Sequence, residues 1–183
     1  MDETQMIRHR NLFFGAVLVL VTSFSGCEFS TEGRSTGDEY SIETAEPVAG
    51  VEVEVRVVKT VRSGSPIELT VSISNNGTFG GRYGVLQGFM DCRLLIRDGD
   101  GRILQTTDKG FRVFGKGRNP EETQVVTLVP GHSRTMTCDL NEHFRFESRY
   151  EDYRLSLKSH LEDPTNPDVV FPILVENLSF RID

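Results

Sequence analysis

The sequence predicts an all-β sandwich, and three observations lead to this fold class. Apolar and polar residues alternate over several short segments, as they do in strands that bury only one face. Clusters of Gly, Pro, Asn, Asp and Ser separate these segments at short intervals. No segment longer than a few turns carries the apolar stripe of an amphipathic helix. We therefore expect about seven or eight short strands over residues 51–183.

The first two strands are predicted from the clearest alternation. Four valines alternate with charged residues over 51–57 (VEVEVRV), and apolar residues occupy every second position of 67–73 (IELTVSI). Residues 63–66 (SGSP) join the two segments, and residues 75–77 (NNG) end the second one with turn-forming chemistry. Each segment is expected to bury one face and expose the other.

Six further strands are predicted from shorter runs of the same alternation. The first two of them flank residues 98–101 (DGDG), which tolerate the positive φ of a tight hairpin turn. In another, Met136 and Cys138 fall on the apolar side. The six segments are 91–97, 102–106, 123–128, 134–140, 153–157 and 174–182.

The N-terminal residues have the three parts of a secretory signal. A basic stretch at residues 8–10 (RHR) precedes an uncharged, almost wholly apolar stretch at 12–21, and mostly small residues follow up to Cys27. The apolar stretch would span only about half of the ~30 Å hydrocarbon core of a bilayer. A cleaved signal is therefore favoured over a retained membrane anchor.

Residues 24–27 (FSGC) resemble the lipobox of bacterial lipoproteins. The resemblance implies cleavage between Gly26 and Cys27, with the Cys27 thiol carrying a diacylglycerol and its amine acylated. Phe24 departs from the family's usual leucine but is also bulky and apolar. Ordinary signal-peptide cleavage and an uncleaved anchor are the alternatives. The lipoprotein interpretation places the chain on the cell membrane or the outer membrane, facing the periplasm or the cell exterior.

The segment after the lipobox differs in composition from the rest of the chain. Residues 28–49 are rich in Ser, Thr, Glu and Gly and show neither a strand nor a helix period. Such a composition buries too little apolar surface to offset its ordering entropy. We therefore expect three parts: a lipoprotein signal peptide over 1–26, a lipidated flexible tether over 27–49, and a β-sandwich over 50–183.

The order of several motifs is similar to that of a known family. Residues 127–131 (TLVPG), 138–140 (CDL), 144–146 (FRF) and 153–157 (YRLSL) follow one another as in the immunoglobulin-like domain that precedes the catalytic domain of deuterolysin-type zinc metallopeptidases. The resemblance covers roughly residues 66–158. It implies an immunoglobulin-like antiparallel β-sandwich, and its motifs specify turns and strands rather than chemistry. The catalytic half of that family has no counterpart in this sequence.

The motifs of common enzyme classes are not met. The four histidines (His9, His132, His143 and His160) lack the H-E-x-x-H spacing of zinc peptidases. Residues 131–133 (GHS) do not form a G-x-S-x-G elbow, and residues 98–101 do not continue as a calcium loop. We therefore predict no catalytic residues, no metal site and no cofactor.

Two cysteines and one loop remain as candidate features of the sandwich. Cys92 and Cys138 fall on buried strand faces, so in an oxidising compartment they form a disulfide or remain two buried thiols. The segment 78–89 contains four glycines together with Phe79, Arg82, Tyr83 and Phe89, which are candidate contact residues. The alternative is that these aromatic side chains fold back over the edge of the sandwich. The basic stretch at 109–122 is expected to be a solvated loop.

The functional prediction follows from the predicted lipobox and from the absence of the catalytic motifs considered above. A net charge of −7 disfavours a nucleic-acid partner. We expect a non-enzymatic lipoprotein that acts as a binding or structural module of the bacterial envelope. It would contact the membrane through its lipid anchor and bind an envelope protein or glycan. The alternative, suggested by the resembling family, is a protease inhibitor or an accessory subunit of a secreted protease.

Overall fold

The computed structural model describes residues 39–183 except 48–49, 118, 147–150, 164 and 167. The predicted signal peptide, the cleavage site between Gly26 and Cys27, and the lipidation site at Cys27 lie outside the described residues. Within the described part of the chain, no helix is long and apolar enough to cross a bilayer.

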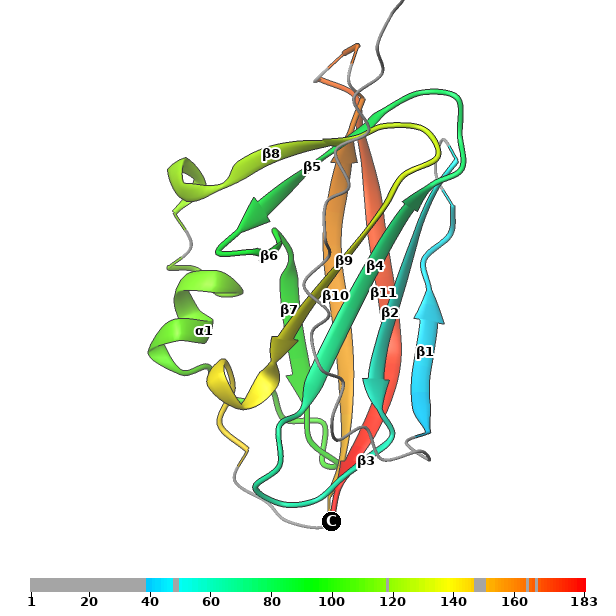
Figure 1. The fold of residues 1–183 in the computed structure, drawn as a ribbon. Helices are drawn as coiled ribbons and strands as arrows, with labels where there is room; N and C mark the ends of the chain where they lie inside the picture. The colour runs from blue at the N-terminus through cyan, green and yellow to red at the C-terminus, as the bar shows by residue number, and fades with distance from the viewer. Residues whose placement is uncertain (1–38, 48–49, 118, 147–150, 164, 167) are drawn as a thin grey trace, which may run out of the picture. The chain divides into compact units, whose positions relative to one another are not determined.

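The described residues form two β-sheets with the core between them (Figure 1). All strand pairs are antiparallel except β11 with β3, which is parallel. The first sheet has the order β1 (Tyr40–Thr44), β2 (Val51–Val58), β4 (Glu68–Asn75) and β9 (Ser133–Asp139). The second has the order β3 (Thr60–Val61), β11 (Val170–Ile182), β10 (Glu151–Glu162), β5 (Gly81–Leu86) and β6 (Phe89–Met90), with β7 (Arg93–Arg97) paired to β10 and β8 (Gln124–Leu128) paired to β5. The predicted all-β sandwich is confirmed.

Period-two alternation builds the first sheet as expected. The inward valines of β2 are at most 4% exposed, and Val55 lies opposite Val71 of β4 in the antiparallel register. The intervening residues of β2, such as Glu52 and Arg56, are only partly buried on the other face. Burying each such apolar side chain stabilises the fold by about 1.5–3 kcal/mol.

The long hairpin of β10 and β11 forms the centre of the second sheet. Leu155 lies opposite Leu178, but Leu157 lies opposite Val175, so β11 carries one extra residue between these pairs. Asn177, with a φ of 65°, lies in this bulge. The bulge changes the strand's parity, so Val175 and Leu178 both face the core.

The folded domain begins earlier than predicted. Tyr40–Thr44, which the composition assigned to the flexible tether, forms β1 and pairs with β2, with Tyr40 opposite Val58 and Thr44 opposite Glu54. The prediction that the tether extends to residue 49 is therefore wrong. Ile42 is the only aliphatic side chain of this strand and is 52% exposed. Backbone pairing rather than apolar burial adds the strand, and composition does not report backbone pairing.

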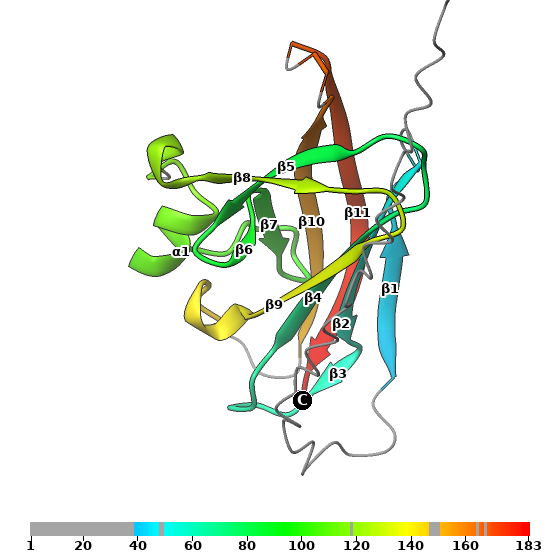
Figure 2. The same ribbon diagram turned by 45° about the horizontal axis from the view of Figure 1, so that its top comes forward.

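Two loop regions also differ from the prediction. Residues 102–106 make only isolated bridges at Ile103 and Thr106 instead of a strand. The basic stretch 109–122 contains most of helix α1 (Asp108–Val113) and the 3-10 turn η1 (Pro120–Glu122). A second 3-10 turn, η2 (Leu140–Glu142), follows β9. Figure 2 shows α1 and η2 on the same side of the sandwich as β6. The described residues contain eleven strands, more than the predicted seven or eight.

Candidate functional site

Asn75, the last residue of β4, joins two loops that cross between the sheets. Its side chain and backbone are fully buried, with 0% exposure. The Asn75 amide donates to the carbonyl oxygen of His132 at 3.0 Å, and its carbonyl accepts from the Gly131 amide at 2.8 Å. These two bonds attach the end of β4 to the turn between β8 and β9.

The side chain of Asn75 uses the remaining hydrogen-bonding groups. Its Nδ2 donates to the carbonyl oxygens of Phe79 and Leu128, each at 2.8 Å, and its Oδ1 accepts from the Gly77 amide at 3.0 Å. The Asn75 residue therefore holds the β4–β5 loop (76–80) and the β8–β9 loop (129–132) in one arrangement. We call these two segments the Asn75 loops.

The backbone at Gly50, just before β2, also holds the β4–β5 loop in place. Gly50, with a φ of +82°, lies so close to Gly77 that an added Cβ would fall 2.3 Å from its Cα. The Asn76 amide donates to the Gly50 carbonyl at 2.8 Å. Only glycine meets both the backbone conformation and the close approach at position 50. The β4–β5 loop is therefore bound to its neighbours on two sides.

The Asn75 loops present apolar side chains to solvent. Phe79 is 71% exposed and Val129 is 46% exposed. The two loops are adjacent, because Gly81 of β5 lies opposite Leu128 of β8 (Figure 1). A large exposed aromatic on a loop ordered by internal hydrogen bonds is typical of a contact surface, since the entropy of ordering the loop has already been spent.

The other predicted contact residues do not join Phe79. Tyr83 and Phe89 are 1% and 3% exposed, and both belong to the core. Arg82 is half-buried on β5 and lies 3.9 Å from the carboxylate of Glu162 on β10. The prediction of one exposed loop carrying all four residues is therefore wrong, and the alternative of aromatic side chains folded onto the sandwich holds for Tyr83 and Phe89.

Cys92 and Cys138 are not joined by a disulfide in the structure. Cys92 is buried just before β7 of the second sheet, and Cys138 is half-buried on β9 of the first. Burial raises the pKa of the Cys138 thiol to about 12, and the carboxylates of Asp139 and Glu142 add to the shift. The thiol is therefore protonated at neutral pH. Of the two alternatives that the sequence leaves open, the structure contains the two free thiols.

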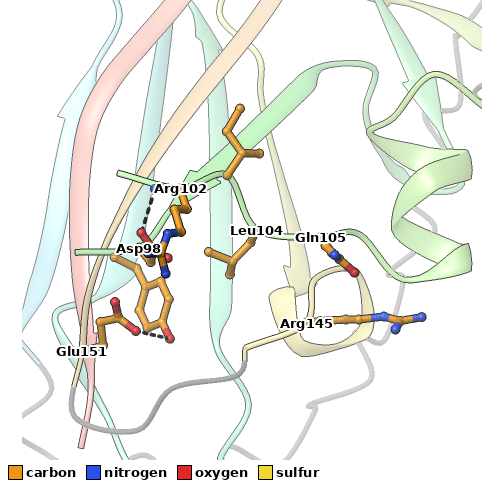
Figure 3. Close-up of a pocket in the computed structure, with 8 residues that line it drawn as sticks. Asp98, Arg102, Leu104, Gln105, Arg145 and Glu151 are labelled. Carbon is orange, nitrogen blue, oxygen red and sulfur yellow. Dashed lines mark hydrogen bonds between the residues drawn. The ribbon is translucent and has the colours of Figure 1, made fainter. Parts of the chain in front are cut away.

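A polar groove of about 250 Å³ lies beside the turn after β7 (Figure 3). Its carboxylates already have partners: the Asp98 carboxylate accepts from the Arg102 amide at 2.7 Å, and Glu151 accepts from the Gly99 amide at 3.1 Å and the Tyr153 hydroxyl at 3.4 Å. The groups therefore stabilise the turn rather than converge on an open position. Within the described ranges, no three His, Cys, Asp or Glu side chains gather as metal ligands.

Comparisons with known proteins give no functional assignment. No family model and no curated protein matches the chain. Among solved structures, a Bordetella pertussis protein described as ApaA is 16% identical, with a TM-score of 0.34, over 78% of this chain and 91% of that chain. The structural-genomics target SoR45 is 11% identical, with a TM-score of 0.36, over 78% of this chain and 83% of that chain.

The hydrogen bonds of the Asn75 side chain predict that its removal strongly lowers the free energy of unfolding, whereas substitution of the next residue does not. Asn75→Ala leaves one buried carbonyl, one part-buried carbonyl and one part-buried amide without their partner and is expected to lower the free energy of unfolding by about 3 kcal/mol or more. Asn76→Ala, at an exposed neighbour, is the matched control and should change it by less than about 0.5 kcal/mol. Urea unfolding of the purified chain measures both, and equal effects would contradict the assigned role of Asn75.

Proposed function

We propose that this protein is a non-enzymatic binding module of the bacterial envelope, held on a membrane by lipid on Cys27, which binds an envelope protein through the Asn75 loops. The carrying observation is Phe79, exposed to 71% on a loop whose backbone is held by a fully buried side chain. Burying a phenylalanine in a partner's pocket contributes about 1.5–3 kcal/mol. The pre-ordered loop adds little conformational cost to binding.

The side chains around Phe79 agree with a protein partner. Exposed apolar residues on a rigid support, rimmed by polar ones, are typical of the centre of a protein interface. Thr78 and His132 are exposed around Phe79 and Val129 and supply such a rim.

The proposed anchor limits the distance of the domain from the membrane. Twelve residues separate Cys27 from Tyr40, where β1 begins. Even a fully extended chain of this length spans at most about 45 Å. A partner would therefore lie on or close to the membrane that carries the lipid.

Membrane anchoring is tested by the fate of Cys27. In the source bacterium, the wild-type chain is expected in the membrane fraction with a diacylglyceryl group on Cys27, detected by mass spectrometry of the mature N-terminus. Cys27→Ala should lose the lipid and leave the membrane fraction, whereas Cys138→Ala should not. A mature chain that still begins at Met1, or an unlipidated Cys27, would overturn the anchor.

Binding through the Asn75 loops is tested with a photo-crosslinking residue at position 79. The crosslinked partner is identified by mass spectrometry, purified and titrated against the wild-type protein and two variants. Phe79→Ala should weaken binding by about ten-fold or more, as expected for a central aromatic contact. Ile103→Ala, at a similarly exposed apolar residue (54%) away from the loops, should change it less than about two-fold. Equal effects of both variants would contradict the proposal.

The same geometry supports inhibition of a protease as a second function. Protease–inhibitor complexes join pre-ordered surfaces that move little on binding. A protease with a hydrophobic specificity pocket accepts one large apolar side chain. The exposed side chain of Phe79 would enter such a pocket. The resemblance to a domain that accompanies a secreted peptidase points in the same direction.

A protease panel distinguishes the two functions. If the loop acts as an inhibitor, the purified chain should slow a protease that cleaves after aromatic residues, and Phe79→Lys should transfer inhibition to one that cleaves after lysine. Asn76→Lys is the control and should not. No inhibition of any protease in the panel would leave the envelope-binding proposal as the function of the Asn75 loops.

A further inference from the structure

Strand β8 forms a free edge of the second sheet. It pairs with β5 on one side, and no other described strand pairs with it. Val85 of β5 lies opposite both Met90 of β6 and Gln124 of β8, so β6 and β8 lie on opposite sides of β5. Figure 1 shows β8 and β5 side by side in the upper part of the view. The other side of β8 is therefore open to a further strand.

The hydrogen bonds of β5 determine which backbone groups point out of this edge. The Asp91 amide donates to the Gly84 carbonyl at 2.8 Å, so the backbone groups of Gly84 face β6 and not β8. Gly84 lies opposite Val125, and hydrogen-bonded pairs alternate along antiparallel strands. The amides and carbonyls of Val125 and Thr127 therefore point away from β5. No hydrogen bond joins these four groups to another described residue.

The exposed side chains of this edge are uncharged. Val125 is 50% exposed, and Val129, just beyond the strand, is 46% exposed. Residues 123–133 contain no Asp, Glu, Lys or Arg, although these residue types make up 26% of the chain. The edge therefore lacks the charges with which many proteins prevent the addition of another strand. An uncharged strand with apolar side chains would meet no repulsion here.

Two other free edges carry such protection. On β11, the Asp163 amide donates to the Val169 carbonyl at 3.0 Å, so odd-numbered residues from Val169 to the bulge face β10. The nitrogen of Pro172 therefore lies on the free side, where it has no hydrogen to donate. On β9, Arg134 lies opposite the fully buried Ile73, so a charged side chain occupies the inward side of that edge. Strand β8 has neither feature.

The edge of β8 is continuous with the Asn75 loops. The Asn75 Nδ2 donates at 2.8 Å both to the carbonyl of Leu128, the last residue of β8, and to the carbonyl of Phe79. Phe79 therefore lies beside the end of this strand. The exposed apolar side chains of Val125, Val129 and Phe79 thus lie along one edge or at its end.

We propose that β8 binds an extended, uncharged segment of the protein partner, which joins the second sheet as a further strand. This inference rests on the proposed function, because it places the partner that contacts Phe79 along β8 as well. The added strand would donate to the carbonyls of Val125 and Thr127 and accept from their amides. Its apolar side chains would lie against Val125 and Val129. In this mode of recognition, main-chain hydrogen bonds give affinity and alternate side chains give specificity.

Amide hydrogen exchange of the full chain, followed by NMR, tests the geometry of the edge. The amides of Val125 and Thr127 should exchange faster than that of Val126 between them, because only Val126 donates to β5. Equal protection of all three amides would overturn the open edge. Protection that rises with the concentration of the chain alone would identify a second copy as the occupant and would also overturn the proposal.

The probe for strand addition is the peptide acetyl-KTVTVTK-amide, compared with the same peptide N-methylated at its central residues. The first peptide should slow exchange of the Val125 and Thr127 amides. The N-methylated peptide cannot donate main-chain hydrogen bonds and should not bind. Failure of the first peptide to bind up to about 5 mM, or equal binding of the two peptides, would overturn the site.

Two proline variants locate the peptide on β8. Val125→Pro removes an outward amide without removing a hydrogen bond to β5, and it should weaken peptide binding by about ten-fold or more. Ile42→Pro is the matched control: Ile42 is 52% exposed on β1, and the Ala45 amide donates to the Val53 carbonyl at 2.9 Å, which places the Ile42 amide on the free side of β1. It should change binding less than about two-fold. Equal effects of the two variants would overturn the assignment to β8.

A further variant guards against a folding defect. Val125→Lys keeps the amide but places a charge on the edge, and it should also weaken peptide binding while the melting temperature stays close to that of the wild type. The partner crosslinked at position 79 separates this inference from the proposed function. Unchanged binding of that partner by Val125→Pro would overturn strand addition and leave the proposed function in place, whereas failure to crosslink any partner at position 79 would contradict the proposed function itself.

Discussion

The hydrogen bonds of one buried amide organise the end of the sandwich that carries the candidate binding surface. The Asn75 side chain satisfies both of its donors and one acceptor with the backbone of Phe79, Leu128 and Gly77. Gly77 and Phe79 lie in the β4–β5 loop, which crosses between the sheets, and Leu128 directly precedes the β8–β9 loop, which crosses back. Because the amide is fully buried, water cannot replace these bonds, so the loops and the core are ordered together. The exposure of Phe79 is therefore a property of the folded state rather than of a mobile loop.

A different corner of the molecule depends on the packing of α1 against η2. The Thr107 hydroxyl donates to the Glu142 carbonyl at 2.6 Å and accepts from the Gly110 amide at 3.1 Å, so one side chain both caps the helix and attaches it to the turn. The close approach of Gly110 to His143 completes this attachment. The helix and the turn are therefore held together by contacts between segments far apart in the chain.

The candidate site was only partly predictable from the residues. Phe79 is exposed, but Tyr83 and Phe89 were grouped with it because glycines interrupt the alternation of β5 and hide the strand. Gly84 is required there for space, since an added Cβ would lie 2.8 Å from Thr123 and 2.9 Å from Asp91. Val129 was missed altogether, because a single valine before a Pro-Gly turn carries no periodic signal.

The sequence by itself determined the strands with regular alternation, the turns between them and the all-β class, because burial of one strand face requires that pattern. Its motif at Cys27 also determined the hypothesis of lipid anchoring, since peptidase recognition is local in the chain. Only the tertiary structure decided which aromatic side chains are exposed, that Tyr40–Thr44 joins the first sheet, and that α1 packs against η2. These features depend on backbone pairing and on contacts between segments far apart in the chain, and neither leaves a periodic pattern in the sequence.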